Sequence, residues 1–388
     1  MKIRILWKKR YCCQMVIIEK MSNPRFIVSG GGTGGHIFPA LSIAEGLKQR
    51  FPDAEILFVG AQGKMEMEKV PAAGFPIVGL PVAGFHRGEI WRNLLFVPKL
   101  IASMWKARSV VRNFKPDCVI GVGGYASGPV LKVATQMGIP TLLQEQNSFA
   151  GVTNKLLGKK ASKICVAYQN MERFFPKEKI VFTGNPIRKG LEGIVAKSEE
   201  SFRFFGLNPD QPVVLVVGGS LGARSLNNGI SAKLDLIRSS GVQFLWQTGK
   251  IYYHEIEAEL ADNPTGNVHL LEFIQRMDLA FAVADLVISR AGAGTISELC
   301  VVGKPAILVP SPNVAEDHQT ANARALADQG AAVLIKDAEV GERLVEEALS
   351  LVKDRGRLAD LAENIKKMAT PLATKDIVEV IASLIDNG

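Results

Sequence analysis

Residues 29–40 read SGGGTGGHIFPA and place five glycines and a histidine directly after the apolar run RFIV (25–28). So many glycines cost backbone entropy and add no packing, so a ligand or another backbone segment is expected to approach closely. Free N–H groups at a helix N-terminus favour an anion such as a phosphate. The motif therefore predicts a phosphate-binding loop at which His36 could accept a proton or contact an anion. The alternative is a tight turn that only packs a helix on a strand.

Two standard nucleotide-binding motifs do not fit this loop. Gly30, Gly32 and Gly35 match G-x-G-x-x-G, but the following strand ends FVGAQG (58–63) without a carboxylate for a ribose. A Walker loop would need Lys followed by Ser or Thr after its last glycine, where this chain has His36 and Ile37. Neither a dinucleotide site nor a P-loop is predicted.

Three more glycine-rich stretches follow apolar runs: GVGGYASG (121–128), VGGSLGA (217–223) and RAGAGTISE (290–298). Four such loops favour a phosphorylated donor and a phosphorylated acceptor over packing alone. In the last stretch a helix is expected to begin near Thr295, with Glu298 in its first turn. This carboxylate could accept both hydroxyls of a ribose, or Thr295 and Glu298 could form a capping box, and spacing leaves both readings open.

Uncharged polar side chains follow two further strands. EDHQTANA (316–323) offers Gln319 and Asn322 at a helix start, and EQN (145–147) follows the strand TLLQ (141–144). Amides suit sugar hydroxyls because they both donate and accept hydrogen bonds. The alternative for the first stretch is Asp317 as a helix N-cap with the other side chains solvated.

The elements that must position these loops form two series of buried strands alternating with amphipathic helices. The first series starts at RFIV and the second at PVVLVV (212–217), and each first strand enters a glycine-rich turn. This alternation predicts an α/β chain with two doubly wound, Rossmann-like domains facing each other across a cleft. The boundary is expected within FTGNPIRKGLEG (182–193), giving domains over 21–185 and 186–372.

The composition fits two globular domains: 388 residues, 47% hydrophobic and 22% charged. Of the net charge of +8, +5 lies in residues 1–20, which are expected to be a disordered basic extension before Met21. No apolar run approaches the length of a membrane span. The five cysteines lack metal-ligand spacing and are expected to be free thiols in a reducing compartment.

Eight motifs in this order resemble a known family. The motifs are GGTGGH (31–36), GGYASG (123–128), QEQN (144–147), GNPIR (184–188), GGSLGAR (218–224), EFI (272–274), RAGAGTISE and DHQTANA (317–323). They resemble the bacterial cell-wall transferases that move N-acetylglucosamine from UDP onto undecaprenyl-linked lipid I, making lipid II. The resemblance runs from about Pro24 to near the C-terminus.

The resemblance implies a GT-B architecture, with the donor mainly in the C-terminal domain and a last helix (about 373–388) crossing back to the N-terminal one. It also implies residues for UDP-N-acetylglucosamine, with Ile274 acting through its backbone at the uracil and Glu298 at the ribose. The donor residues are Thr33, Gly34, Gly35, Asn147, Arg188, Ser220, Ile274, Ala293, Gly294, Thr295, Ile296, Ser297, Glu298 and Gln319. The acceptor-side residues are Gly124, Tyr125, Ser127 and Glu145. His318 stands where some relatives carry a second glutamine.

The implied reaction is an inverting single displacement by the 4-hydroxyl of the N-acetylmuramyl unit, with His36 as the leading candidate for the base. Helix N-termini, Ser220, Thr295 and Arg188 would stabilise the departing UDP. No metal site or cofactor is predicted, although a divalent cation could assist the diphosphate. The alternatives are a UDP-N-acetylglucosamine epimerase, a non-catalytic nucleotide-sugar sensor, and a lipid glycosyltransferase with another acceptor.

A lipid-linked acceptor requires a membrane contact, and residues 85–115 carry seven basic side chains against one acid. The first half of this segment is expected to form a peripheral site on anionic lipid at the cytoplasmic face of the membrane. The site consists of Ile90, Trp91, Leu94 and Leu95, with Arg87, Arg92 and Lys99 beside them. From Lys99 on, a crossover helix is expected to bury Ile101, Met104 and Val111. Other cell-wall synthesis proteins are further expected partners, and nucleic acid is not.

Overall fold

A computed structural model describes residues 23–82, 96–188, 190, 191, 193, 197–219, 221–262, 264–314 and 317–386, without the Phe96 side chain. Several predicted features lie outside the described residues. They are the basic extension, Ser220, and the membrane-site residues Arg87, Ile90, Trp91, Arg92, Leu94 and Leu95.

The N-terminal sheet has seven parallel strands in the order β3-β2-β1-β4-β5-β6-β7. They are β1 (Arg25–Gly30), β2 (Glu55–Ala61), β3 (Ile77–Leu80), β4 (Cys118–Gly123), β5 (Thr141–Glu145), β6 (Lys163–Val166) and β7 (Ile180–Phe182). On one face lies α1 (Gly34–Arg50), and on the other lie α3 (Phe96–Phe114) and α4 (Ser127–Gln136). The remaining helices are α2 (Glu66–Ala72) and α5 (Val152–Gly158). Helices on both faces explain why the strands are continuous apolar runs.

The C-terminal sheet has six parallel strands in the order β10-β9-β8-β11-β12-β13. They are β8 (Val213–Val217), β9 (Gln243–Gln247), β10 (Val268–Leu271), β11 (Leu286–Ser289), β12 (Ala306–Leu308) and β13 (Val333–Leu334). One face carries α6 (Glu199–Phe205), α10 (Met277–Val283), α11 (Ala293–Val302), α12 (His318–Ala327) and α14 (Arg355–Lys367). The other carries α7 (Arg224–Ser231), α8 (Leu234–Arg238), α9 (Tyr253–Asp262) and α13 (Val340–Lys353).

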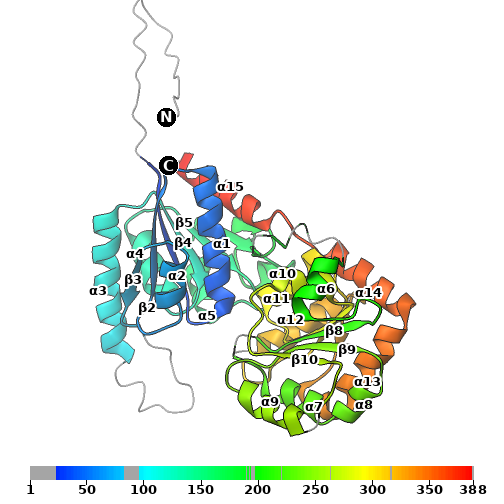
Figure 1. Ribbon diagram of the computed structural model, residues 1–388. Coiled ribbons are helices and arrows are strands. Elements are labelled where there is room, and N and C mark those ends of the chain that lie inside the picture. Colours follow the sequence, from blue (N-terminus) through cyan, green and yellow to red (C-terminus); the bar gives the residue numbers. More distant parts are fainter. Residues whose placement is uncertain are drawn as a thin grey trace, which may run out of the picture.

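In both sheets the strand order reverses at the first strand of the series. β1 lies between β2 and β4, and β8 lies between β9 and β11. In doubly wound sheets the ligand binds where the order reverses, outside the carboxyl ends of the strands. The prediction of two doubly wound domains is confirmed, and Figure 1 shows them side by side.

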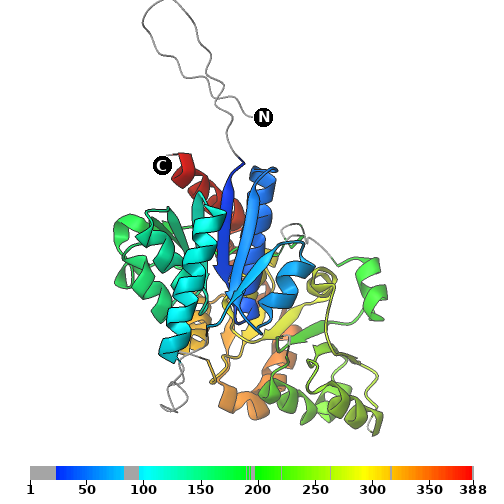
Figure 2. The same ribbon diagram turned by 90° about the vertical axis from the view of Figure 1, so that its left-hand side faces the viewer.

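The last helix, α15 (Ala373–Asp386), lies against α1 of the N-terminal domain, as Figures 1 and 2 both show. Ile377 and Ile381 enter the core of that domain, and Arg50 Nε lies 3.0 Å from Glu379 Oε1. Gly46 makes the close packing possible, because a Cβ there would lie 2.8 Å from Thr374 Cγ2. After the last helix of the C-terminal domain, the chain therefore returns and packs on the N-terminal domain.

Candidate active site

Two glycine-rich loops of the N-terminal domain are in backbone contact. Gly31 follows β1 and Gly124 follows β4, and a Cβ on Gly124 would lie 2.3 Å from the Gly31 carbonyl oxygen. Gly124 also has φ +85°, a conformation that favours glycine. The close approach predicted for SGGGTGG is therefore made in part by GGYASG. The two loops form one surface at the carboxyl ends of β1 and β4.

Glu66, which the sequence did not single out, lies beneath this surface. Its side chain is fully buried at the start of α2. Oε2 accepts a hydrogen bond from Gly32 N at 2.9 Å, and Oε1 accepts one from Ala61 N at 2.9 Å. A Cβ on Gly31 would lie only 2.2 Å from Glu66 Oε1. Gly31 must therefore lack a side chain because the buried Glu66 carboxylate lies against it. Through its two hydrogen bonds this carboxylate links the loop to the end of β2.

His36 is partly buried in the first turn of α1 and packs against Gly123. Its Nδ1 lies 3.3 Å from Thr33 Oγ1. Burial lowers the pKa of His36 to about 4, and the neighbouring His318 lowers it too, whereas a hydrogen bond to the Gly31 backbone and the Glu66 carboxylate raise it. His36 is therefore neutral at pH 7 and able to accept a proton. Because His318 begins α12, the C-terminal domain faces His36 directly.

The four predicted acceptor-side residues differ in what their side chains do. Tyr125 is exposed beside Gly124. Ser127 is buried, with its hydroxyl 2.7 Å from the Ser29 carbonyl oxygen, so it holds the loop to β1. Glu145 is also buried, which raises the pKa of its carboxyl, and its oxygens accept hydrogen bonds from Asn147, Gly151 and Asn154. Ser127 and Glu145 are therefore buried residues that hold the acceptor-side loops in place through hydrogen bonds.

On the donor side, Glu298 and Arg188 contact each other. Glu298 Oε1 lies 2.7 Å from Arg188 Nε, and Oε2 lies 3.1 Å from Arg188 Nη2. The predicted start of the helix near Thr295 is two residues late, because α11 begins at Ala293 with Gly292 as its N-cap residue. Glu298 is therefore in the second turn, and the capping-box interpretation is wrong. The N-terminus of α11 carries no acidic side chain in its first turn, which suits an anionic ligand.

Gln247, at the end of β9, connects two predicted donor segments. Its Nε2 donates to the Gly219 carbonyl oxygen at 3.0 Å, and its Oε1 accepts from Ile274 N at 2.9 Å. The backbone N–H of Ile274 is thus already satisfied. A uracil contact through Ile274 would fall to its carbonyl oxygen.

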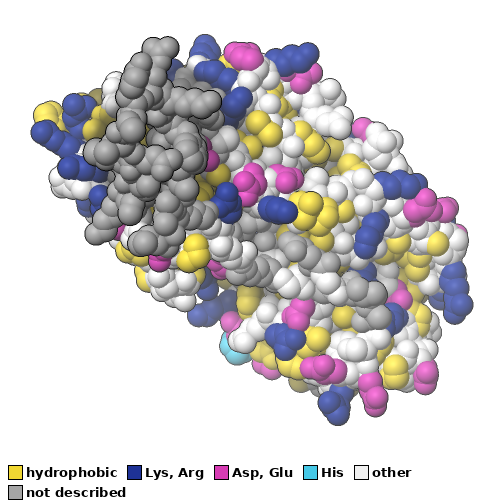
Figure 3. Space-filling view, turned by 90° about the horizontal axis from the view of Figure 1, so that it is seen from above, with side chains coloured by type: hydrophobic (Ala, Val, Ile, Leu, Met, Phe, Trp, Pro, Cys, Tyr) yellow, Lys and Arg dark blue, Asp and Glu magenta, His cyan; other side chains and the backbone are white. Residues whose placement is uncertain are grey.

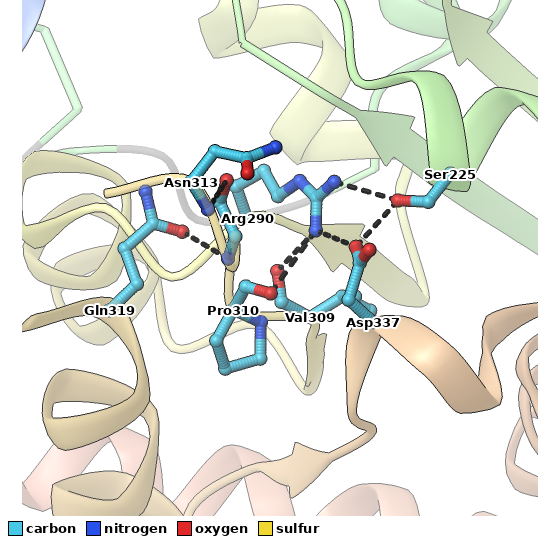
Figure 4. A network of polar contacts seen from close by, with 8 residues as sticks. Ser225, Arg290, Val309, Pro310, Asn313, Gln319 and Asp337 are labelled. Carbon is cyan, nitrogen blue, oxygen red and sulfur yellow. Dashed lines mark hydrogen bonds and ion pairs between the residues drawn. The ribbon is translucent and has the colours of Figure 1, made fainter. Parts of the chain in front are cut away.

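The start of α12 is held by Gln319, whose Oε1 accepts from Ser311 N at 2.9 Å (Figure 4). Asp317 is the N-cap residue, but it makes no side-chain capping bond, and its Oδ1 accepts from Thr320 Oγ1 instead. Asn322, one turn further on, joins the domains. It accepts from Ser148 N at 3.0 Å and donates to Asn147 Oδ1 at 3.2 Å.

Arg290, the first residue of RAGAGTISE, connects three segments of the chain at this edge of the sheet (Figure 4). Its guanidinium pairs with Asp337 Oδ1 at 2.5 Å and donates to Ser225 Oγ at 2.7 Å. It also donates to the carbonyl oxygens of Val309 and Pro310, at 3.2 and 3.3 Å. A planar five-donor group suits such a junction, which positions the start of α7 relative to the loop before α12.

The surface of α3 corrects one sequence-based expectation. Ser103, Ala107 and Val111 recur every four residues and form its buried face. Val111 and Met104 pack on the sheet as predicted, but Ile101 points away from it and is 53% exposed. Ile101 lies in line with Val97 and Trp105, which are 59% and 73% exposed. These three residues are called the α3 stripe below.

Basic side chains accompany the α3 stripe. Lys99, Arg108 and Arg112 are exposed on the same helix. Figure 3 shows hydrophobic and basic side chains gathered at the left-hand edge of the molecule, the side on which α3 lies in Figure 1. No helix in the described part of the chain combines the length and hydropathy needed to cross a bilayer. Among the described residues there is also no group of three or more His, Cys, Asp or Glu that could hold a metal ion.

Family models match both halves of the chain. The glycosyltransferase family 28 N-terminal domain matches residues 26–166, and the family 28 C-terminal domain matches residues 213–377. Among solved structures, a crystal structure of Acinetobacter baumannii MurG superposes with a TM-score of 0.75 at 31% identity, covering 93% of this chain and 99% of that one. A putative UDP-N-acetylglucosamine 2-epimerase from Listeria monocytogenes is 15% identical, with a TM-score of 0.68 over 95% of this chain and 98% of its own, and so shares the fold.

Curated relatives match over nearly their whole length. A protein of Parabacteroides distasonis is 57% identical over 94% of this chain and 100% of its own length. It is named UDP-N-acetylglucosamine–N-acetylmuramyl-(pentapeptide) pyrophosphoryl-undecaprenol N-acetylglucosamine transferase. A protein of Flavobacterium psychrophilum with the same name is 51% identical over 95% of this chain and 99% of its own.

Proposed function

Because the chain belongs to glycosyltransferase family 28, and within it to the transferases named for the relatives above, we propose that it carries their reaction. It transfers N-acetylglucosamine from UDP-N-acetylglucosamine to the 4-hydroxyl of the N-acetylmuramyl unit of undecaprenyl-linked lipid I, forming lipid II. The observation that supports this most is a neutral histidine on one domain facing donor-type motifs on the other. An epimerase would have no use for the acceptor loop GGYASG.

The proposed donor site lies at the carboxyl ends of β8, β9, β11 and β12. The N-terminus of α11 and Arg188 would stabilise the negative charge that develops on the departing UDP. Glu298 would accept the ribose hydroxyls, because a carboxylate has lone pairs beyond those that Arg188 uses. Gln319 and Asn147 would contact the sugar, and no bound metal is needed for these roles.

The proposed base is His36. The acceptor 4-hydroxyl oxygen bonds to the anomeric carbon as the bond from that carbon to the UDP oxygen breaks, and the electron pair leaves with UDP. The hydroxyl proton passes to the imidazole, which is neutral at pH 7 because burial lowers the pKa of His36 to about 4. Attack from the face opposite UDP inverts the anomeric configuration.

The α3 stripe extends the predicted membrane site. It presents Val97, Ile101 and Trp105 to solvent next to exposed basic residues. Apolar side chains can enter the interfacial region of a bilayer, and each nearby Lys or Arg adds about 1 kcal/mol on anionic lipid. We place the protein at the cytoplasmic face of the membrane, with this face of the N-terminal domain against the lipid.

The function is tested by supplying the acceptor or withholding it. Purified protein is incubated with UDP-N-acetylglucosamine and lipid I, or with the donor alone, and UDP release is followed. The transferase requires lipid I for UDP release and converts it to a product larger by one N-acetylhexosamine. Release of UDP or isomerisation of the donor at the same rate without lipid I would instead support the epimerase.

A further inference from the structure

The carboxylate of Glu66 is fully buried under the loop that carries His36. Burying a carboxylate is costly unless hydrogen bonds compensate for lost water, and Glu66 has two such bonds, from Gly32 N and Ala61 N. Two glycines leave room for the Glu66 side chain. A Cβ on Gly31 would lie 2.2 Å from Glu66 Oε1, and a Cβ on Gly60 would lie 2.6 Å from Glu66 Cγ. The chain around Glu66 is thus shaped to admit this one carboxyl group.

A single peptide group connects Glu66 to His36. The N–H of the Gly31–Gly32 peptide donates to Glu66 Oε2 at 2.9 Å. The carbonyl oxygen of the same peptide, that of Gly31, lies against Gly124, and the neighbouring Gly123 packs on the His36 ring. A hydrogen bond between the imidazole and the Gly31 backbone accordingly raises the pKa of His36. Hydrogen bonds in series polarise one another in a low-dielectric interior. A negative charge at the N–H end therefore makes the Gly31 carbonyl a stronger acceptor for the imidazole proton.

We propose that Glu66 is a positioning residue for the transfer reaction, acting on His36 through the Gly31–Gly32 peptide. The inference rests on the proposed role of His36 as the base. When His36 takes the proton of the acceptor hydroxyl it becomes an imidazolium, and the Glu66 charge stabilises that cation. The peptide bridge also fixes which ring nitrogen carries a proton before the reaction, leaving the other to accept one.

The groups facing His36 come from four elements. Glu66 on α2 favours the imidazolium, whereas His318 on α12 opposes it. Thr33, the N-cap residue of α1, contributes a hydroxyl, and Gly123, the last residue of β4, contributes only backbone. Among these described neighbours, Glu66 is the one that supplies negative charge.

The test is a double-mutant cycle on turnover with lipid I, using Glu66→Gln, His36→Ala and the double variant. Glu66→Gln keeps the side-chain size and removes the charge, and we expect it to lower kcat roughly 10–100-fold, part of what a general base contributes. In the His36→Ala background the same change should cost less than about 3-fold, because the group it acts through is gone. Glu68→Gln, on the exposed side of α2, is the matched control and should behave like the parent.

Two further readouts separate positioning from folding. UDP affinity and thermal midpoint report whether Glu66→Gln is folded, and Glu66→Asp, which keeps the charge, should recover part of the turnover. Histidine NMR titration measures the pKa of His36 without any turnover, and this pKa should fall in Glu66→Gln. This measurement does not depend on lipid I being the acceptor. Failure of the proposed function can therefore be distinguished from failure of the proposal for Glu66.

Three results would overturn the proposal. One is an undiminished cost of Glu66→Gln in the His36→Ala background, which would mean a structural role independent of His36. The others are parental turnover in folded Glu66→Gln and an unchanged pKa of His36 in that variant.

Discussion

Arg188 and Glu298 form a bidentate ion pair that joins the segment after the N-terminal domain to α11 of the C-terminal domain. The carboxylate is nearly buried, with 8% of the Glu298 side chain exposed, and the guanidinium also lies over the Phe38 ring at 5.4 Å. A fork-to-fork pair of this kind fixes the carboxylate plane. The oxygens then keep lone pairs in set directions for the ribose hydroxyls.

Glu298→Ala should weaken UDP and UDP-N-acetylglucosamine binding together. Each lost hydrogen bond to a charged acceptor costs about 1.5–3 kcal/mol, so affinity should fall roughly 10-fold or more. Calorimetric titration of the folded variant with UDP measures this. Arg188→Met is the partner variant, and the double variant should cost less than the sum of the two because the residues are coupled. Unchanged UDP affinity in Glu298→Ala would remove the ribose role.

The sequence predicted both sheets because strands buried on both faces and glycine-rich turns are local signals. It could not predict Glu66, since an acidic residue in KMEMEKV (64–70) looks like a solvated helix residue until Gly31, Gly32 and Ala61 are folded around it. Arg290 was overlooked for the same reason, because its partners Ser225 and Asp337 lie far away in the chain.

Ile101 shows the limit of periodicity. Its spacing from Met104 and Val111 suits a buried face, but the true buried face runs through the small residues Ser103 and Ala107, which carry little apolar signal. The pairing of Glu298 with Arg188 could not be predicted either, because a capping box and an ion pair require the same carboxylate. Only the start of α11 at Ala293 distinguishes them.

The pH dependence of kcat/KM should report His36. Because burial lowers the pKa of His36 from its ordinary value of 6.5 to about 4, the acid limb assigned to it is expected near pH 4, with no loss attributable to this group between pH 6.5 and 5. The same lowered pKa means that the unfolded chain binds the proton more readily. The His36 contribution to stability is therefore present above pH 6.5 and lost as pH falls through 6.5 towards 4.

Initial rates taken within seconds of a pH jump separate titration of the base from slow unfolding. His36→Ala should lower turnover roughly 100-fold or more while UDP affinity stays near that of the parent. An acid limb near 6.5 that disappears in His36→Ala would show that the imidazole is solvated in the working enzyme. Near-parental turnover of His36→Ala at saturating lipid I would rule out His36 as the base.

The α3 stripe should contribute to binding of anionic vesicles. Ile101→Ser with Trp105→Ser removes two exposed apolar side chains and should weaken sedimentation with such vesicles several-fold, with little effect on the thermal midpoint. The chain should start at Met21 so that the basic residues 1–20 cannot bind lipid themselves. Ile251→Ser is the control, since Ile251 is also exposed, at 64%, but belongs to the C-terminal domain. Equal pelleting of parent and double variant would exclude the stripe.

The glycosidic linkage in the product decides whether transfer to the muramyl 4-hydroxyl is direct and inverting. The product formed from UDP-N-acetylglucosamine and lipid I is isolated, and its glycosidic bond is assigned by NMR from the anomeric coupling and the correlation across the linkage. Inverting transfer predicts a β-linked N-acetylglucosamine on the 4-oxygen of the N-acetylmuramyl unit. An α linkage, attachment at another hydroxyl, or recovery of unchanged lipid I beside an isomerised donor would contradict it.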